Sequence, residues 1–132
     1  MTYVFYNDLA YWPYYLGYML CGLLIIIGSI ITHELGHLLY FKLTLNKEVK
    51  LKIFRKGYQF KIYAGEQSDY ALLTNSQYRH VNLFGIIFGL FPISIASLVW
   101  TPYFFLIIPY FFGCRKDIYE FLKNLSPDLE DN

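Results

Sequence analysis

Long uncharged stretches dominate the pattern of hydrophobic and polar positions. No charged side chain occurs from Leu9 to Thr32, a run of 24 residues, and a second run of 34 residues extends from Val81 to Cys114. A helix needs about 20 apolar residues to cross the hydrocarbon core of a bilayer. The first run therefore predicts one membrane-spanning helix. The second is long enough for two short helices, with the turn between them at Trp100-Thr101-Pro102, where Thr101 can cap and Pro102 suits the first helical position.

Boundary signals place three helices along the chain. The first is expected at about 13–43, which is longer than the hydrocarbon is thick, so its last turns emerge from the bilayer. The second is expected at about 75–99, because Thr74 and Gln77 match a capping box just before an apolar run. The third is expected at about 102–125, with Pro109 and Gly113 weakening its backbone hydrogen bonds.

Residues 49–63 change to a period of two. Apolar residues alternate with lysines and glutamine on both sides of Arg55-Lys56-Gly57 in VKLKIFRKGYQFKIY. Gly57 tolerates the positive φ of a tight turn, so this pattern predicts a β-hairpin with one apolar and one basic face. Such a hairpin suits an anionic membrane surface, and its exposed edge could pair with an extended peptide. Residues 64–73 are expected to be a connector.

Composition supports a membrane protein. Hydrophobic residues make up 56% of the chain and charged residues 16%, whereas about a quarter of a soluble domain is charged. Fourteen Tyr and twelve Phe fit the aromatic belts at membrane interfaces. The expected fold class is therefore mainly α and polytopic. A single domain, 1–132, would contain three transmembrane helices with a β-hairpin between the first two.

Basic residues predict the orientation in a cell membrane. Eight Lys and Arg occur from Lys42 to Arg79 against three acids, and Arg115, Lys116 and Lys123 follow near the end of the chain. No Lys or Arg precedes Lys42. By the positive-inside rule, the N-terminus lies outside, and the 42–79 loop and the C-terminus are cytoplasmic.

The chemistry is concentrated in HELGH, residues 33–37. His33 and His37 are four residues apart, so on a helix both imidazoles face one side and can bind the same metal ion. Glu34 points about 100° away and suits a general base that activates zinc-bound water. Gly36 leaves the helix surface bare beside the metal. Ionisable groups in a membrane segment are costly, which favours a functional site over two helix histidines without a role.

A catalytic zinc site needs a third protein ligand. The metzincin extension is absent, because LLYFKL follows His37. The predicted topology favours Asp117, which follows the break at Gly113 near the level of HELGH, and His80 on the second helix is the alternative. The full set of candidates is Glu48, Glu66, Asp69, His80, Cys114, Asp117 and Glu120.

The order of elements around HELGH resembles the site-2 protease family of intramembrane zinc metalloproteases. Val81-Asn82-Leu83-Phe84-Gly85 is weakly similar to the start of the family's second core helix. The resemblance implies that His33, His37 and Asp117 bind Zn²⁺ and that Glu34 is the general base. The family usually shows its aspartate as Leu-Asp-Gly or Asn-Pro-Asp-Gly, whereas this chain has Lys116-Asp117-Ile118. That context is similar to small bacterial zincin-like membrane peptidases.

The resulting hypothesis is an intramembrane zinc endopeptidase. It would cleave a membrane protein or membrane-associated peptide in or near a transmembrane segment, with the lipid bilayer as its environment and no nucleic-acid partner. The alternative is a zinc-binding membrane protein without protease activity, such as an immunity-type, chaperone-like or transport subunit. A glutamate beside the histidine pair favours hydrolysis over storage or transport.

Overall fold

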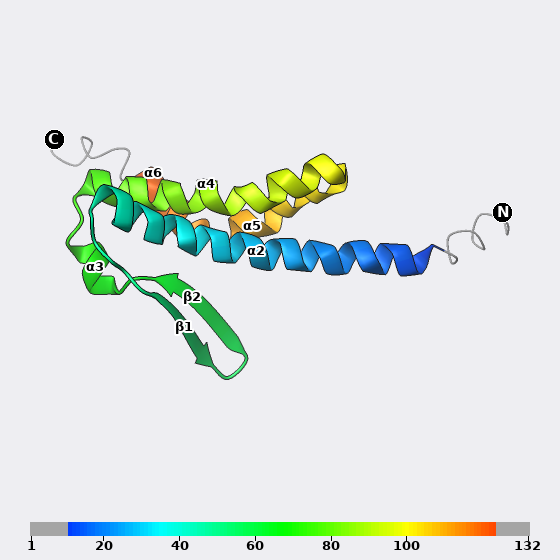
Figure 1. Cartoon of the computed structure of the whole chain (residues 1–132), viewed down its shortest axis with the longest axis horizontal. Coiled ribbons are helices and arrows are strands. Elements are labelled where there is room, and N and C mark those ends of the chain that lie inside the picture. The colour runs from blue at the N-terminus through cyan, green and yellow to red at the C-terminus, as the bar shows by residue number, and fades with distance from the viewer. Residues whose placement is uncertain (1–10, 124–132) are drawn as a thin grey trace.

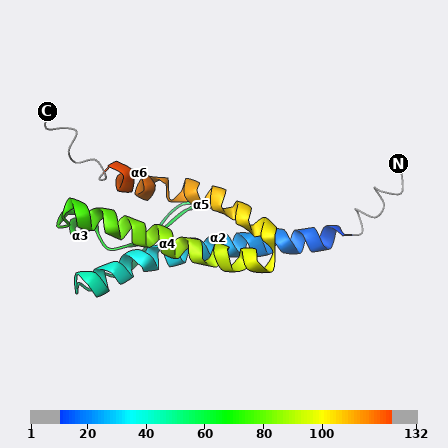
Figure 2. The same ribbon diagram turned by 90° about the horizontal axis from the view of Figure 1, so that it is seen from above.

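The computed structural model describes residues 11–123. Helices dominate this part of the chain, and a two-stranded antiparallel sheet accompanies them. The helices α2 (Trp12–Thr44) and α4 (Asn75–Val99) lie side by side and run in opposite directions (Figures 1 and 2). The hairpin lies beside the C-terminal half of α2, outside the helical bundle (Figure 1). The predicted combination of helices with an intervening hairpin is confirmed.

The two long helices are suited by length and composition to cross a membrane. Among the described residues, α2 and α4 meet this criterion, and Thr101–Gly113 forms a shorter apolar stretch. Large apolar side chains on both long helices, such as Leu23, Leu24 and Phe91, are more than half exposed. A core helix of a water-soluble protein would bury such side chains.

The ends of α2 and α4 follow from local sequence. Pro13 lies in the first turn of α2, where its missing N–H costs nothing. α2 ends at Thr44 with Leu45 as its C-cap, and Asn46 directly after the cap adopts a φ of 48°, which asparagine tolerates. Thr74 accepts a hydrogen bond from the Gln77 N–H at 3.3 Å, and the Gln77 side chain accepts one from the Thr74 N–H at 3.1 Å. The predicted capping box at α4 is therefore present.

The observed hairpin agrees closely with the one predicted from the sequence. Strand β1 (Leu51–Lys56) pairs with β2 (Gln59–Ala64), and Gly57 in the turn has a φ of 60°. The connector differs from the expectation, because it contains a short helix, α3 (Gln67–Ala71). A capping box between Glu66 and Asp69 starts this helix.

Two ion pairs hold the connector against the hairpin and the end of α2. Lys47 Nζ lies 2.7 Å from Asp69 Oδ1, and this ammonium holds the pKa of Asp69 below its usual value. Lys52 on β1 pairs with Glu66. These contacts are exposed to solvent, so they fix the path of the chain more than they add stability.

The third predicted helix is divided into three segments. A 3₁₀ helix, η1 (Thr101–Leu106), leads into α5 (Ile107–Gly113), and α6 (Arg115–Lys123) follows after a break at Cys114. The break expected at Gly113 is present, between Gly113 and Arg115, whereas the 3₁₀ start of the segment expected at 102–125 was not predicted. The expected end at 125 lies outside the described residues. Pro109 cannot donate a backbone hydrogen bond, which weakens an α-helix in the turn before it. Since α4 continues through Pro92, this loss alone does not account for the 3₁₀ conformation.

The turn before this segment also differs from the expectation. Trp100 occupies the cap position of η1, and no side chain caps the helix. Thr101 is the first residue of η1, because the Tyr103 N–H already bonds to the Trp100 carbonyl at 3.0 Å. Thr101 therefore does not act as the predicted cap.

Two small clusters of buried side chains form the contacts between α2, α4 and α5. Tyr40, Phe41 and Val81 form one cluster near the C-terminal end of α2. Ile93, Tyr110 and Cys114 form the other, which packs against Ile25 and Ile26. Since HELGH lies between these two levels of α2, the clusters hold α4 and α5 in place on both sides of the histidines.

Gly36 and Gly85 permit the close approach of α2 and α4. A Cβ on Gly36 would lie 2.7 Å from the Phe84 carbonyl oxygen, and a Cβ on Gly85 would lie 2.7 Å from Nε2 of His37. Both separations are too short for any side chain. The bare helix surface predicted at Gly36 is therefore filled by the backbone of α4, and Gly85 leaves room for an imidazole ring.

Candidate metal centre

The two histidines share one face of α2, as their spacing predicts. Their ring centroids are 4.7 Å apart, and His33 and His37 are 5% and 4% exposed. Buried imidazoles need partners for both ring nitrogens. The identity of those partners determines which nitrogen carries a proton and which can bind a cation.

The Nδ1 atoms of both rings are bound by groups from other helices. His37 Nδ1 lies 2.8 Å from the Val81 carbonyl oxygen on α4, and since a carbonyl only accepts, His37 donates from Nδ1. His33 Nδ1 lies 2.9 Å from the Tyr110 hydroxyl. That hydroxyl donates its own proton to the Ile86 carbonyl at 3.0 Å, so it accepts from His33. Both Nε2 atoms are consequently left with a lone pair.

Asp117 on α6 completes a group of three ligand atoms. Its Oδ2 lies 2.5 Å from His33 Nε2 and 3.2 Å from His37 Nε2, and the two Nε2 atoms are 3.0 Å apart. Three lone-pair atoms repel one another at such distances unless a proton or a metal cation lies among them. Tetrahedral zinc with bonds of about 2.0–2.1 Å would separate its ligand atoms by about 3.3 Å. The separations of 3.0 and 3.2 Å are close to this value, whereas the 2.5 Å contact between His33 and Asp117 would have to lengthen around an ion. The donor set is one that could hold a metal ion, and two imidazoles with a carboxylate are ligands that zinc accepts.

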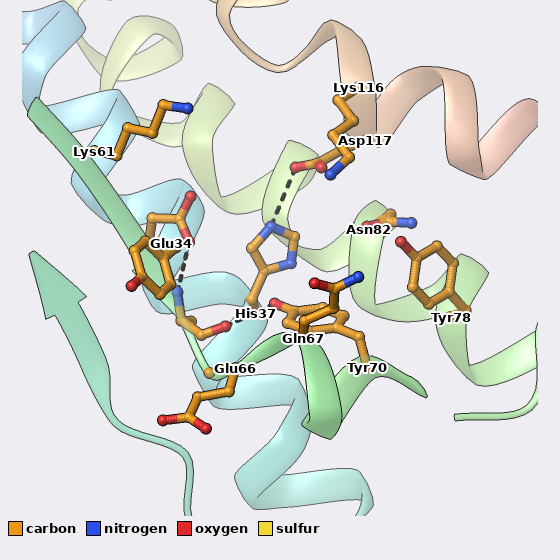
Figure 3. A pocket seen from close by; sticks show the side chains of 13 residues that line it. Glu34, His37, Lys61, Glu66, Gln67, Tyr70, Tyr78, Asn82, Lys116 and Asp117 are labelled. Atoms are coloured by element: carbon orange, nitrogen blue, oxygen red, sulfur yellow. Dashed lines mark hydrogen bonds and ion pairs between the residues drawn. The ribbon is translucent and has the colours of Figure 1, made fainter. Parts of the chain in front are cut away.

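Glu34 lies beside this group without belonging to it. Its carboxylate is half-buried, and Oε2 accepts a hydrogen bond from the Ala64 N–H of β2 at 2.9 Å (Figure 3). Ala64 in turn accepts from the Tyr70 hydroxyl at 2.9 Å. The hairpin edge thus holds the Glu34 carboxylate outside the group of His33, His37 and Asp117, at the wall of a cavity that it shares with His37 and Asp117.

The other candidate ligands lie outside the group of three. His80 is exposed, and its ring lies 6.5 Å from the ring of Tyr40. Glu66 and Asp69 are engaged in the ion pairs with lysines described above. Among the described residues, the group that could hold a metal consists of His33, His37 and Asp117. The remaining candidates outside it are Glu48, Cys114 and Glu120.

Two cavities open onto the centre from different sides. The larger, about 620 Å³, is lined by polar residues of the connector and α4, including Tyr70, Tyr78 and Asn82 (Figure 3). The smaller, about 450 Å³, has an apolar wall that includes Ile26, Ile30 and Pro109. Glu34 and Asp117 line both cavities. A bound peptide could therefore cross the metal centre with a polar part on one side and an apolar part on the other.

Several residues that shape the centre carry no signal in the sequence. Tyr110 and the Val81 carbonyl orient the imidazoles, and the Ala64 N–H orients Glu34. Tyr110 is one of fourteen tyrosines, and the other two partners are backbone atoms. Only knowledge of the helix packing could have identified them.

Tyr110→Phe is expected to weaken zinc binding about 10- to 100-fold, the usual cost of losing a partner that orients a metal ligand. The change removes the acceptor for His33 Nδ1–H and keeps the ring in the buried cluster. Competition with a chromophoric chelator measures the dissociation constant. The control is Tyr103→Phe, which removes a hydroxyl that bonds to the Tyr18 carbonyl at 3.1 Å. Equal zinc affinity of both variants would show that Tyr110 does not orient His33.

Comparisons with protein-family models, curated proteins and solved structures find no match for this chain. Any conclusion about its activity therefore depends on the residues and geometry described above.

Proposed function

We propose that this chain is a multi-pass membrane zinc endopeptidase of the site-2 protease type. The observation that carries the proposal is the convergence of His33, His37 and Asp117, with Glu34 held beside them at the wall of two cavities. Two histidines and a carboxylate are a zinc ligand set of hydrolases, and a nearby unligated glutamate is the group that such hydrolysis requires.

The proposed topology has three membrane passes in the cell membrane. α2 and α4 provide two of them, and Thr101–Gly113 provides a third, shorter pass. The excess of Lys and Arg in the 42–79 loop and near the C-terminus supports a cytoplasmic location for both, with the N-terminus outside. The metal centre would then lie near the cytoplasmic face, where a peptide leaving the bilayer meets water.

The reaction assigns separate tasks to the residues of the centre. When bound, zinc supplies a Lewis acid that polarises the scissile carbonyl and acidifies water. The Glu34 carboxylate accepts a proton from the attacking water and later donates it to the leaving amine. The Ala64 N–H keeps that carboxylate in place through both transfers, and Tyr110 and Val81 keep the proton of each imidazole on Nδ1.

An extended substrate would pair with the hairpin. Among the described residues, β2 is paired on one edge only, by β1, and its other edge ends at Ala64 beside Glu34. A peptide added along this edge would run toward the metal centre in the extended form that peptidases require.

The test combines metal analysis with a cleavage assay. The purified, detergent-solubilised protein is expected to contain about one zinc per chain and to cleave some members of a panel of single-span peptides. A chelator should stop cleavage, and added zinc should restore it. Full zinc occupancy without cleavage of any peptide would favour the non-proteolytic metal-binding alternative. Absence of zinc even after refilling would contradict the proposal as a whole.

A further inference from the structure

Two lysines border both cavities at the metal centre. Lys61 comes from β2 and Lys116 from α6, and both are exposed. In Figure 3, Lys61 lies above Glu34, and Lys116 lies beside Asp117. A peptide that reached the metal centre through either cavity would therefore pass both lysines.

Neither lysine has an acidic partner in the described part of the chain. Among residues 11–123, ion pairs are formed by Lys47 and Lys52 but not by Lys61 or Lys116. The acids that line the larger cavity are already engaged by other groups. Glu34 accepts from the Ala64 N–H, Asp117 contacts both histidines, and Glu66 pairs with Lys52.

The positive charges of Lys61 and Lys116 are not neutralised by the other charged groups at the centre. The two histidines are neutral when their Nε2 atoms bind a cation, so a divalent ion balances the carboxylates of Glu34 and Asp117. The ammonium groups of Lys61 and Lys116 then remain as net positive charge among the residues that line both cavities. Opposite charge on a substrate would be attracted to this position.

We propose that Lys61 and Lys116 bind a carboxylate of the substrate next to the scissile bond. The apolar wall of the smaller cavity would receive a hydrophobic residue on the other side of that bond. This inference rests on the proposed function and names its substrate class, a peptide in which an acidic residue follows or precedes the end of an apolar, membrane-embedded segment. The lysines select the substrate and are not assigned a role in the chemical step.

A binding experiment tests the lysines without requiring turnover. The Glu34→Gln variant, loaded with zinc in a neutral detergent, is titrated into three labelled peptides, and fluorescence anisotropy gives their dissociation constants. The peptides share one apolar segment and differ only in Glu, Gln or Lys at its end. The Glu peptide is expected to bind about fivefold more tightly than the Gln peptide, as two exposed ion pairs would provide, and the Lys peptide more weakly than both.

Charge-matched variants separate a local effect from a general one. Lys61→Gln with Lys116→Gln should remove the preference for Glu and leave the zinc content unchanged. Lys50→Gln with Lys56→Gln removes the same charge from hairpin positions outside both cavities and should keep the preference. Equal binding of the Glu and Gln peptides before any lysine is changed would overturn the proposal. A preference that survives the loss of Lys61 and Lys116 would also overturn it.

Two further measurements distinguish a lipid ligand from a peptide ligand, and failure of the lysine site from failure of the proposed protease function. If an anionic phospholipid abolishes the Glu preference and a zwitterionic one does not, the lysines bind lipid headgroups and the proposal is wrong. The wild-type protein is assayed for cleavage of the same three peptides. Glu-selective binding without cleavage would contradict the protease and support the lysine site. Cleavage with no preference for Glu would support the protease and contradict the lysine site.

Discussion

Glu34→Gln is expected to lower kcat for peptide cleavage about 10²- to 10⁴-fold, the usual contribution of a general base. Glutamine retains the shape of the side chain, and its Oε1 can still accept from the Ala64 N–H. Its amide cannot accept the proton of the attacking water. Because Glu34 lies outside the group of His33, His37 and Asp117, zinc content is expected to stay at the wild-type level.

Parallel measurements of kcat and zinc per chain test this expectation. Glu48→Gln is the matched control, since it makes the same chemical change at an exposed position outside both cavities, and it should leave kcat and zinc unchanged. Loss of zinc together with cleavage in Glu34→Gln would show that Glu34 holds the centre together. Cleavage at the wild-type rate would remove Glu34 from the reaction.

Asp117→Ala is expected to abolish stable zinc binding. The change leaves two imidazoles, which is one protein ligand too few for a catalytic zinc site. Loss of a residue that only orients a ligand weakens metal binding about 10- to 100-fold, and loss of a ligand should cost more. Zinc per chain after dialysis against a competing chelator measures the effect, and circular dichroism shows whether the helices persist.

His80→Ala is the control for Asp117→Ala, because His80 is exposed and lies outside the group of three. It should retain zinc at the wild-type level. Asp117→Asn adds a variant of nearly unchanged shape that lacks the carboxylate charge, and it should also lose most of the zinc. Zinc loss in His80→Ala, with zinc kept in Asp117→Ala, would transfer the third ligand to α4 and contradict the centre described above.

Local sequence predicted the elements whose determinants lie within a few residues of one another. The capping box at Thr74 and Gln77, the turn at Gly57 and the shared face of His33 and His37 all depend on neighbours in the chain. Helical and strand periods place such residues without reference to the rest of the fold. The expected bounds of the first two helices and of the hairpin as a whole therefore differ by about one to two residues from those of α2, α4 and the β1–β2 hairpin.

In the third helical segment, local reasoning located the break near Gly113 but did not predict the 3₁₀ start. Pro109 and Gly113 indicate weak points, yet they do not say whether the chain bends, changes to a 3₁₀ helix or continues. The outcome is a 3₁₀ start, a short α5 and a break at Cys114, whose side chain is buried with Ile93 and Tyr110. In the folded chain this segment packs against Ile25, Ile26 and Ile93 of α2 and α4, contacts that the local sequence does not specify.

By itself, the sequence determined that this chain has two long apolar helices, a hairpin between them, and two histidines and a glutamate at metal-binding spacing. Only the tertiary structure decided that Asp117 meets His33 across 84 residues and that Tyr110 orients the same ring across 77. The physical reason is the distance along the sequence over which each kind of interaction acts. Hydrophobic pattern and helical period act over a few residues, whereas a metal centre depends on how separate helices pack, and that packing follows from the whole set of contacts.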